Sequence, residues 1–251
     1  MIYDRLQVAL LSTLLFEKAG SPYALIAQYL LAHAGRPDTL SVKAVAQACS
    51  VGTGTVSRFA KDAGFASFAD LCAACAETRA DFDQMPGDSV GQRAEALARH
   101  VALSVARAAA SVDADALARL VADLHAYEHV SAYGFLKANA AAIDLQVDLL
   151  MQGKYVRTCA TPAEQARRIA AARDDELVIV FSYTGTYFDS CDVANALRRS
   201  DRPRIWMVSG GAGPLPAFVH DHLRFASDHD RAGHPYQLEC IAGIIAQEYA
   251  T

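Results

Sequence analysis

The sequence lacks a long hydrophobic run and a secretory signal, and both absences limit where the protein can work. No window of its 251 residues approaches the roughly 20 uncharged apolar residues that a membrane-spanning helix needs, so no membrane partner is expected. A secretory signal has a basic start and a small-residue cleavage site, whereas here Asp4 stands beside Arg5 and Glu17 beside Lys18. We therefore expect a cytoplasmic protein.

The sequence is also poor in cysteine for a disulfide-rich or zinc-binding domain. Its six cysteines are scattered along the chain, unlike those of a small secreted scaffold, so we expect them to be reduced. Cys72 and Cys75 have the C-x-x-C spacing of half a zinc site, but no second pair of cysteines or histidines lies at a suitable interval. They fit a buried helix face better, and we predict neither a metal nor a cofactor.

The chain has no overall excess of positive charge, since its formal net charge is −5. DNA binding depends on neutralising phosphates, so the distribution of charge matters more than its sum. Residues 1–76 hold six basic against five acidic residues, a net of +1, and residues 77–251 hold 17 against 23, a net of −6. Within 41–64 three basic residues stand against one acidic residue, a net of +2. Any contact with DNA is therefore predicted in the first third.

Strand-like segments are missing from the first third of the chain and recur after it. Apolar residues up to about residue 78 repeat at helical spacing, which predicts an all-α domain over residues 1–78. The stretch MPGDSVG at 85–91 has little apolar content and concentrates Pro, Gly, Asp and Ser, so we place a linker over 79–91. Residues 92–251 are the second predicted domain.

The second domain alternates short β-rich runs with segments of helical length. The predicted strands are 129–134, 154–158, 177–182, 204–209 and 222–226. The predicted helices are 92–111, a helix capped by Asp113 or Asp115 and ending near His125, then 136–152, 161–172, 187–200 and 235–250. Strands separated by helices imply parallel neighbours, because a parallel pair needs a long return connection. We therefore predict an α/β domain with a mostly parallel sheet.

Residues 41–65 have the layout of two helices joined by a tight turn. Ser41 can cap the first helix, residues 49–52 make the turn, and Val56 and Phe59 face the core at a spacing of three. The polar residues of the second helix lie on its opposite face, which suits a recognition helix in the major groove. The predicted DNA-contacting residues are Thr53, Thr55, Ser57, Arg58 and Lys61. The pattern alone leaves a protein–protein helical hairpin open as the alternative.

This segment resembles the helix-turn-helix of the RpiR family of bacterial transcriptional regulators. That family has a V-S-x-A-T-V-x-R-F motif followed by a G-F-x-x-F segment, and the matching residues here are Val51, Thr55, Val56, Arg58, Phe59, Gly64, Phe65 and Phe68. The chain departs from the family at Gly52, which replaces a usual Ser, and at Gly54, which replaces a usual Ala. We expect Gly54 to loosen the second helix by up to roughly 1 kcal/mol relative to Ala.

The resemblance implies a second domain of the sugar isomerase (SIS) type, which binds phosphosugars or their derivatives. The loop 133–139 resembles the SIS motif G-x-G-x-S: Gly134 matches, while Leu136 stands at the second Gly and Ala138 at the Ser. The loop 182–187 resembles the motif S-x-S-G-x-T. There Ser182 and Gly185 match, Thr184 replaces a Ser, and Tyr187 stands at the final Thr.

Both loops are expected at carboxyl ends of strands, where helix N-termini offer N–H groups and a partial positive charge to an anion. The predicted effector-binding residues are Gly134, Lys137, Ser182, Thr184, Gly185 and Thr186. The missing hydroxyl at 138, the leucine at 136 and the ring at 187 depart from a conventional phosphosugar site. A phosphosugar, an altered anionic ligand and no ligand therefore remain as three possibilities.

Catalysis would need a base near the substrate, and five residues close to the last helix could be considered for it. They are Asp228, His229, Asp230, His234 and Glu239. Charged loop residues are more often solvated than catalytic, so we predict that the chain is not an enzyme.

The sequence thus predicts a homodimeric or larger transcriptional regulator that binds operator DNA and senses a small sugar-derived anion. An apolar stripe on the Ala-rich helix 92–111 is predicted to cover the sheet and, where it is in surplus, to dimerise. Its residues are Leu97, Val101, Val105 and Ala108. Two alternatives remain: a sugar-phosphate isomerase with a helical appendage, and a regulator whose SIS-like domain only dimerises.

Overall fold

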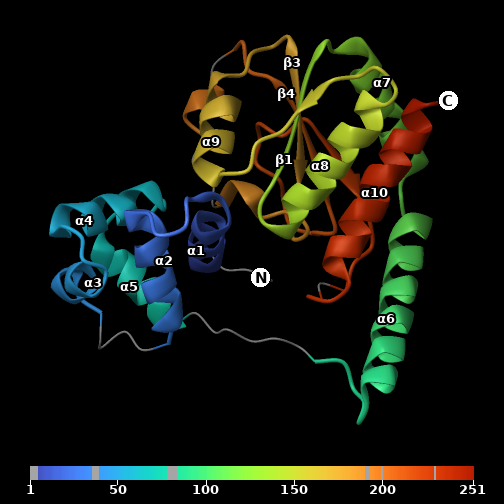
Figure 1. The fold of residues 1–251 in the computed structure, drawn as a ribbon. Helices are drawn as coiled ribbons and strands as arrows, with labels where there is room; N and C mark the ends of the chain where they lie inside the picture. The colour runs from blue at the N-terminus through green and yellow to red at the C-terminus, as the bar shows by residue number, and fades with distance from the viewer. Residues whose placement is uncertain (1–4, 36–39, 78–83, 190–192, 199, 229) are drawn as a thin grey trace.

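The computed structural model describes the chain except residues 1–4, 36–39, 78–83, 190–192, 199 and 229 (Figure 1). Described residues 5–77, called the head below, hold five helices. They are α1 (Arg5–Phe16), α2 (Pro22–Ala32), α3 (Val42–Ala48), α4 (Thr53–Asp62) and α5 (Phe68–Glu77). None of the described residues of the head lies in a strand, in agreement with the predicted all-α fold.

The head has a core of its own, made by apolar residues that recur on one face of each helix. Leu6 and Leu10 of α1 are at most 1% exposed, as are Ile26 and Leu30 of α2. Both pairs have the four-residue spacing that puts two side chains on one side of a helix. Full burial of such a side chain stabilises a fold by about 1.5–3 kcal/mol.

The remaining described residues form the α/β domain. Its helices are α6 (Val90–Ala110), α7 (Ala114–Ala126), α8 (Lys137–Leu150), α9 (Pro162–Ala171) and α10 (His234–Tyr249), with the 3-10 turns η2 (Tyr187–Asp189) and η3 (Ala196–Arg198). Its strands are β1 (His129–Gly134), β2 (Val156–Arg157), β3 (Glu176–Phe181), β4 (Arg204–Ser209) and β5 (Asp221–Arg224). Asp113, one of the two predicted caps, starts α7 by accepting hydrogen bonds from two backbone N–H groups.

The strands form one parallel sheet in the order β2-β1-β3-β4-β5, as the alternation of strands and helices predicted. Helices cover both of its faces, and Figure 1 shows α9 across the sheet from α8 and α10. In β3, Leu177 and Ile179 pack on the side of α7, α8 and α10, whereas Val178 and Val180 pack on the side of α9. A strand buried on both faces has to be apolar throughout, which explains the continuous run LVIVF.

One predicted helix is absent as such. Over 187–200 the described residues form the turns η2 and η3 instead, and residues 190–192 and 199 lie outside the description. Tyr187, Val193 and Leu197 are at most 2% exposed and share a cluster with α9. Their spacings of six and four do not keep to one face of a helix, so short turns bury them better.

The only tryptophan of the sequence is part of the sheet. Trp206 in β4 is fully buried, and its indole N–H donates to the carboxylate of Asp123 on α7 at 2.6 Å. Arg204 donates to the same carboxylate. This shared acceptor fastens α7 to β4.

The start of α6 lies inside the predicted linker. Ser89 and Gln92 form a reciprocal capping box at this helix start, which places the first helical residue at Val90. Residues 78–83, where the predicted head ends and the predicted linker begins, are outside the described residues, so the domain limits stay a prediction. Among the helices that the structure describes, none has both the length and the apolar character for crossing a membrane.

Candidate functional site

The first candidate site is formed by α3 and α4, which are joined by a tight turn. Ser41 caps α3, its Oγ accepting a hydrogen bond from the N–H of Ala44 at 3.1 Å. Ser50 adopts a φ of 53°, and the N–H of Val51 bonds back to the carbonyl oxygen of Ala46 at 2.9 Å. This left-handed residue ends α3 and directs the chain into α4.

Helix α4 separates a core face from an exposed face. Val56 and Phe59 are at most 1% exposed and belong to the core of the head. Among the predicted DNA-contacting residues, the exposed ones are Thr53, Ser57, Arg58 and Lys61, and the half-buried one is Thr55. At 100° per residue the four exposed residues fall on the side away from the core. Four of the five predicted contacts therefore share one solvent-facing surface, and Thr55 lies at its edge.

The N-terminal half of α4 is held less firmly than that of α3. Its N-cap is Gly52, which has no side chain to accept a hydrogen bond, and Gly54 has open space where a Cβ would stand. The guanidinium of Arg58 makes one long contact, from Nε to the carbonyl oxygen of Gly54 at 3.4 Å. An exposed guanidinium held this weakly can reorient toward a guanine edge or a phosphate.

Tyr23 holds α4 against α2, a role that sequence reasoning missed. The ring of Tyr23 meets the ring of Phe59 edge-on at a centroid distance of 5.2 Å, and its hydroxyl donates to the carboxylate of Asp62. Burial, together with the neighbouring Asp62, raises the pKa of Tyr23 to about 12. The phenol thus keeps its proton at neutral pH and fixes the last turn of α4. From the sequence, Asp62 contributes only to the charge balance of residues 41–64, where it is the single acidic residue.

The second candidate site lies at the carboxyl ends of β1 and β3. The sheet order places these strands side by side, with β2 continuing one way and β4 and β5 the other. Such a reversal is a topological switch point, and open α/β sheets bind ligands in the crevice outside the strand ends at that point. The two loops that the sequence singled out, 133–139 and 182–187, follow these two strands.

In the first loop the backbone keeps a shape that favours glycine. A Cβ at Gly134 would come within 2.6 Å of the carbonyl group of Ala138, so only glycine lets the end of β1 approach α8 this closely. Leu136 adopts φ 53° and ψ −120°, a conformation that costs a residue other than glycine about 1–3 kcal/mol. Lys137 is exposed at the first position of α8. The loop thus keeps a backbone shape that favours glycine, and Leu136 occupies one of its strained positions.

In the second loop Gly185 sits in a tight turn. It adopts a φ of 79°, and its N–H donates to the carbonyl oxygen of Ser182 at 3.0 Å. Ser182 is only 7% exposed, whereas Thr184 and Thr186 are half-buried and their hydroxyls bond each other at 2.7 Å. Two adjacent hydroxyls at the mouth of a loop can donate to an anion oxygen. The loop runs into the short turn η2, so the helix expected to follow it offers no N-terminus here.

The bulk of Tyr187 suggested that its ring would crowd the mouth of the loop, but the ring points elsewhere. It is 2% exposed, and its ring stacks on Phe135 of the first loop at a centroid distance of 4.2 Å. Its hydroxyl donates to Oε1 of Gln165 on α9 at 2.8 Å. Gln165 was not singled out from the sequence, where a lone glutamine on a helix carries no distinctive signal.

Of the residues considered for catalysis, His234 and Asp230 lie near the start of α10. His234 is 3% exposed, its Nδ1 is 3.0 Å from the carbonyl oxygen of Arg231, and burial lowers its pKa to about 4. Asp230 contacts Nε2 of His100 at 2.8 Å, which ties this loop to α6. The imidazole of His234 is thus buried and neutral, and the carboxylate of Asp230 is paired with His100. Both side chains have structural roles here.

The remaining three of these residues are Asp228, Glu239 and His229. Asp228 is exposed and bonded to Arg107, and Glu239 lies on α10, where burial raises the pKa of its carboxyl group. His229 is outside the described residues. Cys75, of the C-x-x-C pair, is fully buried in the core of the head.

Part of the head matches a known family of domains. Residues 23–81 match the family model of the "Helix-turn-helix domain, rpiR family". The match covers the whole of α3 and α4. No curated protein sequence matches the chain significantly.

Comparison with solved structures identifies the fold of the whole chain. The NanR protein of Vibrio vulnificus, complexed with ManNAc-6P, is 17% identical with a TM-score of 0.55, over 98% of this chain and 91% of that one. The sugar isomerase domain of an RpiR transcription factor from Sphaerobacter thermophilus is 17% identical with a TM-score of 0.51, over 61% and 87%. An inferred sugar-phosphate isomerase from Listeria monocytogenes is 10% identical with a TM-score of 0.54, over 65% and 91%. At these identities the likeness shows a shared fold.

Proposed function

We propose that this chain, whose residues 23–81 belong to the rpiR-family helix-turn-helix domain and whose α/β domain has the fold of sugar isomerase domains, is a transcriptional regulator controlled by a sugar-derived anion. The observation that carries the proposal is the exposed polar face of α4 within a domain of that family. A solvent-facing set of hydroxyls and cations on a helix suits the major groove, where side chains meet base edges and phosphates together.

The proposed DNA contacts are made by the residues of that face. Arg58 lies in the middle of α4 and has the fork of donors that reads guanine or grips phosphate. Lys61 in the last turn of the helix would neutralise a phosphate, and Thr53, Thr55 and Ser57 would donate from their hydroxyls. The carboxylate of Asp62 accepts a hydrogen bond from Tyr23, which holds this acidic side chain toward α2.

The proposed effector site comprises the two loops at the switch point of the sheet. Gly134 and Gly185 give the loops their shape, and Ser182, Thr184, Thr186 and Lys137 supply donors. NanR, which shares the fold, is complexed with a sugar phosphate, and this supports an anionic sugar derivative as the ligand class here. The strained Leu136 and the turn that replaces a helix after the second loop favour a ligand different in shape from that of a conventional site.

We propose that the regulator works as a homodimer, because a helix-turn-helix protein reads two half-sites related by symmetry. Of the stripe predicted on α6, Ala108 is fully buried and Leu97 is 37% exposed. A more exposed apolar stripe runs along α8 and continues beyond its end. Its residues, each at least 44% exposed, are Ile143, Val147, Leu150, Met151 and Tyr155. The spacing of Ile143, Val147 and Leu150 puts them on one side of α8, which makes this side, with the residues after it, the better candidate for the contact between two copies.

The proposal is tested first on the wild-type chain. Selection of bound duplexes from a random DNA pool should converge on one sequence with two related halves, and a gel-shift titration should then give specific binding. Failure to enrich any sequence, with the folded protein in excess, would contradict the DNA-binding role. Sedimentation velocity should show a dimer that Val147→Asp weakens and that Leu103→Asp, an exposed change on α6, leaves intact.

The effector is tested by thermal unfolding with ManNAc-6P and with arabinose, ribulose and hexosamine phosphates. A ligand at 100 times its dissociation constant should stabilise the protein by about 2.7 kcal/mol. The same mixtures, analysed for conversion of the sugar phosphate, separate the regulator from an isomerase: turnover without DNA binding would establish the isomerase instead. Absence of any stabilisation across the panel would leave an α/β domain that only dimerises.

A further inference from the structure

Helix α9 carries one buried side chain that bonds three separate segments of the α/β domain. Gln165 is fully buried, and its Nε2 donates to the carbonyl oxygens of Gly134 and Cys159, each at 2.8 Å. Its Oε1 accepts from the hydroxyl of Tyr187 at 2.8 Å. Gly134 begins the first loop at the switch point, Tyr187 ends the second, and Cys159 precedes α9 itself. A single amide therefore sets the position of both loops relative to α9.

This arrangement is rigid because each polar group of the amide is engaged. In a buried site a hydrogen bond cannot be exchanged for one to water, so an amide with all its partners defines one geometry. The stacking of Phe135 on Tyr187 joins the two loops directly and strengthens the connection. A movement of either loop is thus passed on to α9 through Gln165.

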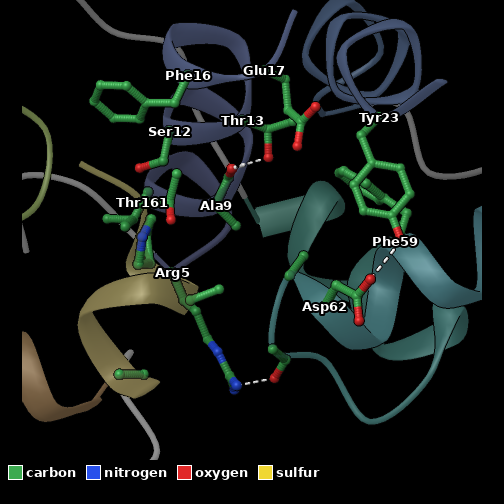
Figure 2. Close-up of a pocket in the computed structure, with 16 residues that line it drawn as sticks. Arg5, Ala9, Ser12, Thr13, Phe16, Glu17, Tyr23, Phe59, Asp62 and Thr161 are labelled. Carbon is green, nitrogen blue, oxygen red and sulfur yellow. Dashed lines mark hydrogen bonds between the residues drawn. The ribbon is translucent and has the colours of Figure 1, made fainter. Parts of the chain in front are cut away.

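The N-terminal end of the same helix faces the head. Four residues at this end line a cavity of about 520 Å³, and they are Thr161, Pro162, Ala163 and Ala166. The opposite wall is made by α1 and the end of α4, with Val8, Ser12 and Asp62 among its residues (Figure 2). The head and the α/β domain thus approach each other here across a hollow.

A hollow contact can open or close more easily than a packed one, since protein interiors are otherwise filled to crystal density. The Oγ of Ser12 is buried and has no hydrogen-bond partner among the described residues. It lines the cavity, as does Thr161 at the start of α9, and Figure 2 shows both beside it. A buried hydroxyl without a partner favours any arrangement of the two domains that supplies one.

We propose that Gln165 is a positioning residue for the two effector loops and that α9 transmits the state of these loops to the head through α1. The inference rests on the proposed function, in which an anion binds to the two loops. A ten-residue helix is about 15 Å long and moves as a unit, so a shift at Gln165 displaces the end that faces the cavity. Helix α1 packs on α2 and α5, and the whole head therefore turns with it.

The first test measures hydrogen–deuterium exchange in the full chain without ligand or DNA. Tyr187→Phe deletes one hydrogen bond to Gln165 and keeps the ring, and Gln165→Met keeps the length of the side chain and deletes every hydrogen bond of the amide. We expect exchange in the loops 133–139 and 182–187 to rise about fivefold in Tyr187→Phe, the factor that corresponds to one typical hydrogen bond. Exchange in α1 should change with it, although α1 contains neither mutation.

A purely local role of Gln165 predicts a different result. In that case exchange rises in the two loops, α9 and η2, and α1 keeps its wild-type rate in both variants. This outcome would overturn transmission through α9. Gln165→Glu retains an oxygen that can accept from the hydroxyl of Tyr187. If the two side chains act through this hydrogen bond, exchange at η2 should be slower in Gln165→Glu than in Gln165→Met. A general loss of packing would not produce this difference.

The second test breaks the contact with the head and leaves the loops alone. Ala163 is exposed and lines the cavity, and Ala163→Arg would add a bulky cation opposite Arg5, which lines the same cavity. Ala171→Arg is the matched control, because Ala171 is exposed on the same helix but outside the cavity lining. We expect Ala163→Arg to change exchange in α1 and leave both loops unchanged, and Ala171→Arg to change neither.

The final arm separates this inference from the proposed function. Gel shifts with the selected DNA are repeated with and without the sugar phosphate that stabilises the wild type. We expect the ligand to change the dissociation constant at least about fivefold in the wild type and Ala171→Arg, and less than about twofold in Tyr187→Phe and Ala163→Arg. Full response in those two variants would refute transmission through α9. A wild-type chain that binds no DNA contradicts the proposed function, while the exchange results still decide the mechanical link.

Discussion

The head and the α/β domain present their candidate binding groups in opposite ways. On α4 the proposed contacts Ser57, Arg58 and Lys61 project into solvent, and the core of the head lies behind them. At the switch point of the sheet Ser182 is buried, and the hydroxyls of Thr184 and Thr186 bond each other. The exposed face of α4 suits a large partner that approaches from outside. The switch point suits a small ligand that must replace bonds already made within the protein.

This difference teaches which departures from a family pattern matter in each place. Gly54 for alanine on α4 changes helix stability and leaves the exposed face intact, because open space surrounds the position. Leu136 for glycine in the first loop puts strain directly beside the proposed ligand. A substitution in the loops of the α/β domain therefore alters which ligand can bind. A substitution on the exposed face of α4 mainly alters the stability of the helix that carries the face.

The largest expected effect concerns the exposed face. Arg58→Ala should weaken binding of the selected DNA by about 1–3 kcal/mol, because it removes a charge-assisted, bidentate donor. Arg99→Ala, an exposed arginine on α6 paired with Glu95, is the control and should leave affinity unchanged. Gel shifts at one fixed salt concentration measure both. Equal affinities for the two variants would break the assignment of α4 as the face that meets DNA.

The next prediction concerns the enclosed polar groups of the α/β domain. The pKa of His234 falls from its ordinary 6.5 to about 4 on folding, so the unfolded chain binds a proton between these values and the folded chain does not. Stability is therefore complete above pH 6.5 and is lost as the pH falls toward 4. From pH 7 to 5 we expect a loss of about 2 kcal/mol in the free energy of unfolding.

Urea unfolding at pH 7, 6 and 5 checks this loss, with His234→Gln as the comparison. The variant carries no titrating group at 234, and its stability should depend less on pH. An equal pH dependence in both proteins would show that the imidazole is not held neutral by its surroundings. The carboxyl group of Asp230, whose pKa is lowered by bonds to the backbone and to His100, contributes a loss only below this range, where the unfolded chain takes up its proton.

A third prediction sharpens the contrast between strained and open glycine positions. Leu136→Gly should stabilise the protein by about 1 kcal/mol, because relief of the strain at φ 53° outweighs the greater freedom of glycine in the unfolded chain. Leu103→Gly, in the exposed middle of α6, should instead cost about 1 kcal/mol. Thermal unfolding measures the two signs. A loss at Leu136 would mean that the leucine side chain has a packing role that exceeds the strain.

The smallest effect is expected at the start of the recognition helix. Gly54→Ala should stabilise the head by about 0.5–1 kcal/mol, since nothing lies within 4 Å of the new Cβ. Gly64→Ala is the counterpart, with φ at +87° and Nη2 of Arg5 3.1 Å from the added Cβ, and it should destabilise. Circular dichroism melts compare them. No gain from Gly54→Ala would imply that the glycine is used in binding, which the gel shift then detects.

The sequence was sufficient for the parts of the fold that depend on periodicity and caps. The spacing of Val56 and Phe59 predicted which face of α4 is buried, and the β-rich run at 177–182 predicted the strand β3. It misjudged 187–200, because apolar residues at uneven spacing were taken for a helix although two turns bury them. Local pattern could not show that Tyr187 turns toward α9.

The candidate site was predictable only in part for a similar reason. The loops at 133–139 and 182–187 could be located because glycine and hydroxyl residues follow strands, and strand ends meet at one edge. Gln165 could not be located, since its four partners lie 6, 22, 26 and 31 residues away and only the sheet order brings them together. The same holds for Tyr23 and Asp62, which are 39 residues apart.

The burial of Trp206 has a practical consequence for the unfolding measurements. The indole is the only one in the chain, it lies in β4, and its N–H is bonded to Asp123 within the same domain. Its fluorescence therefore reports on the unfolding of the sheet and is silent when the head melts. A helical signal that falls before the fluorescence changes would reveal a head that unfolds first, so the unmodified chain carries an optical probe that distinguishes its two domains.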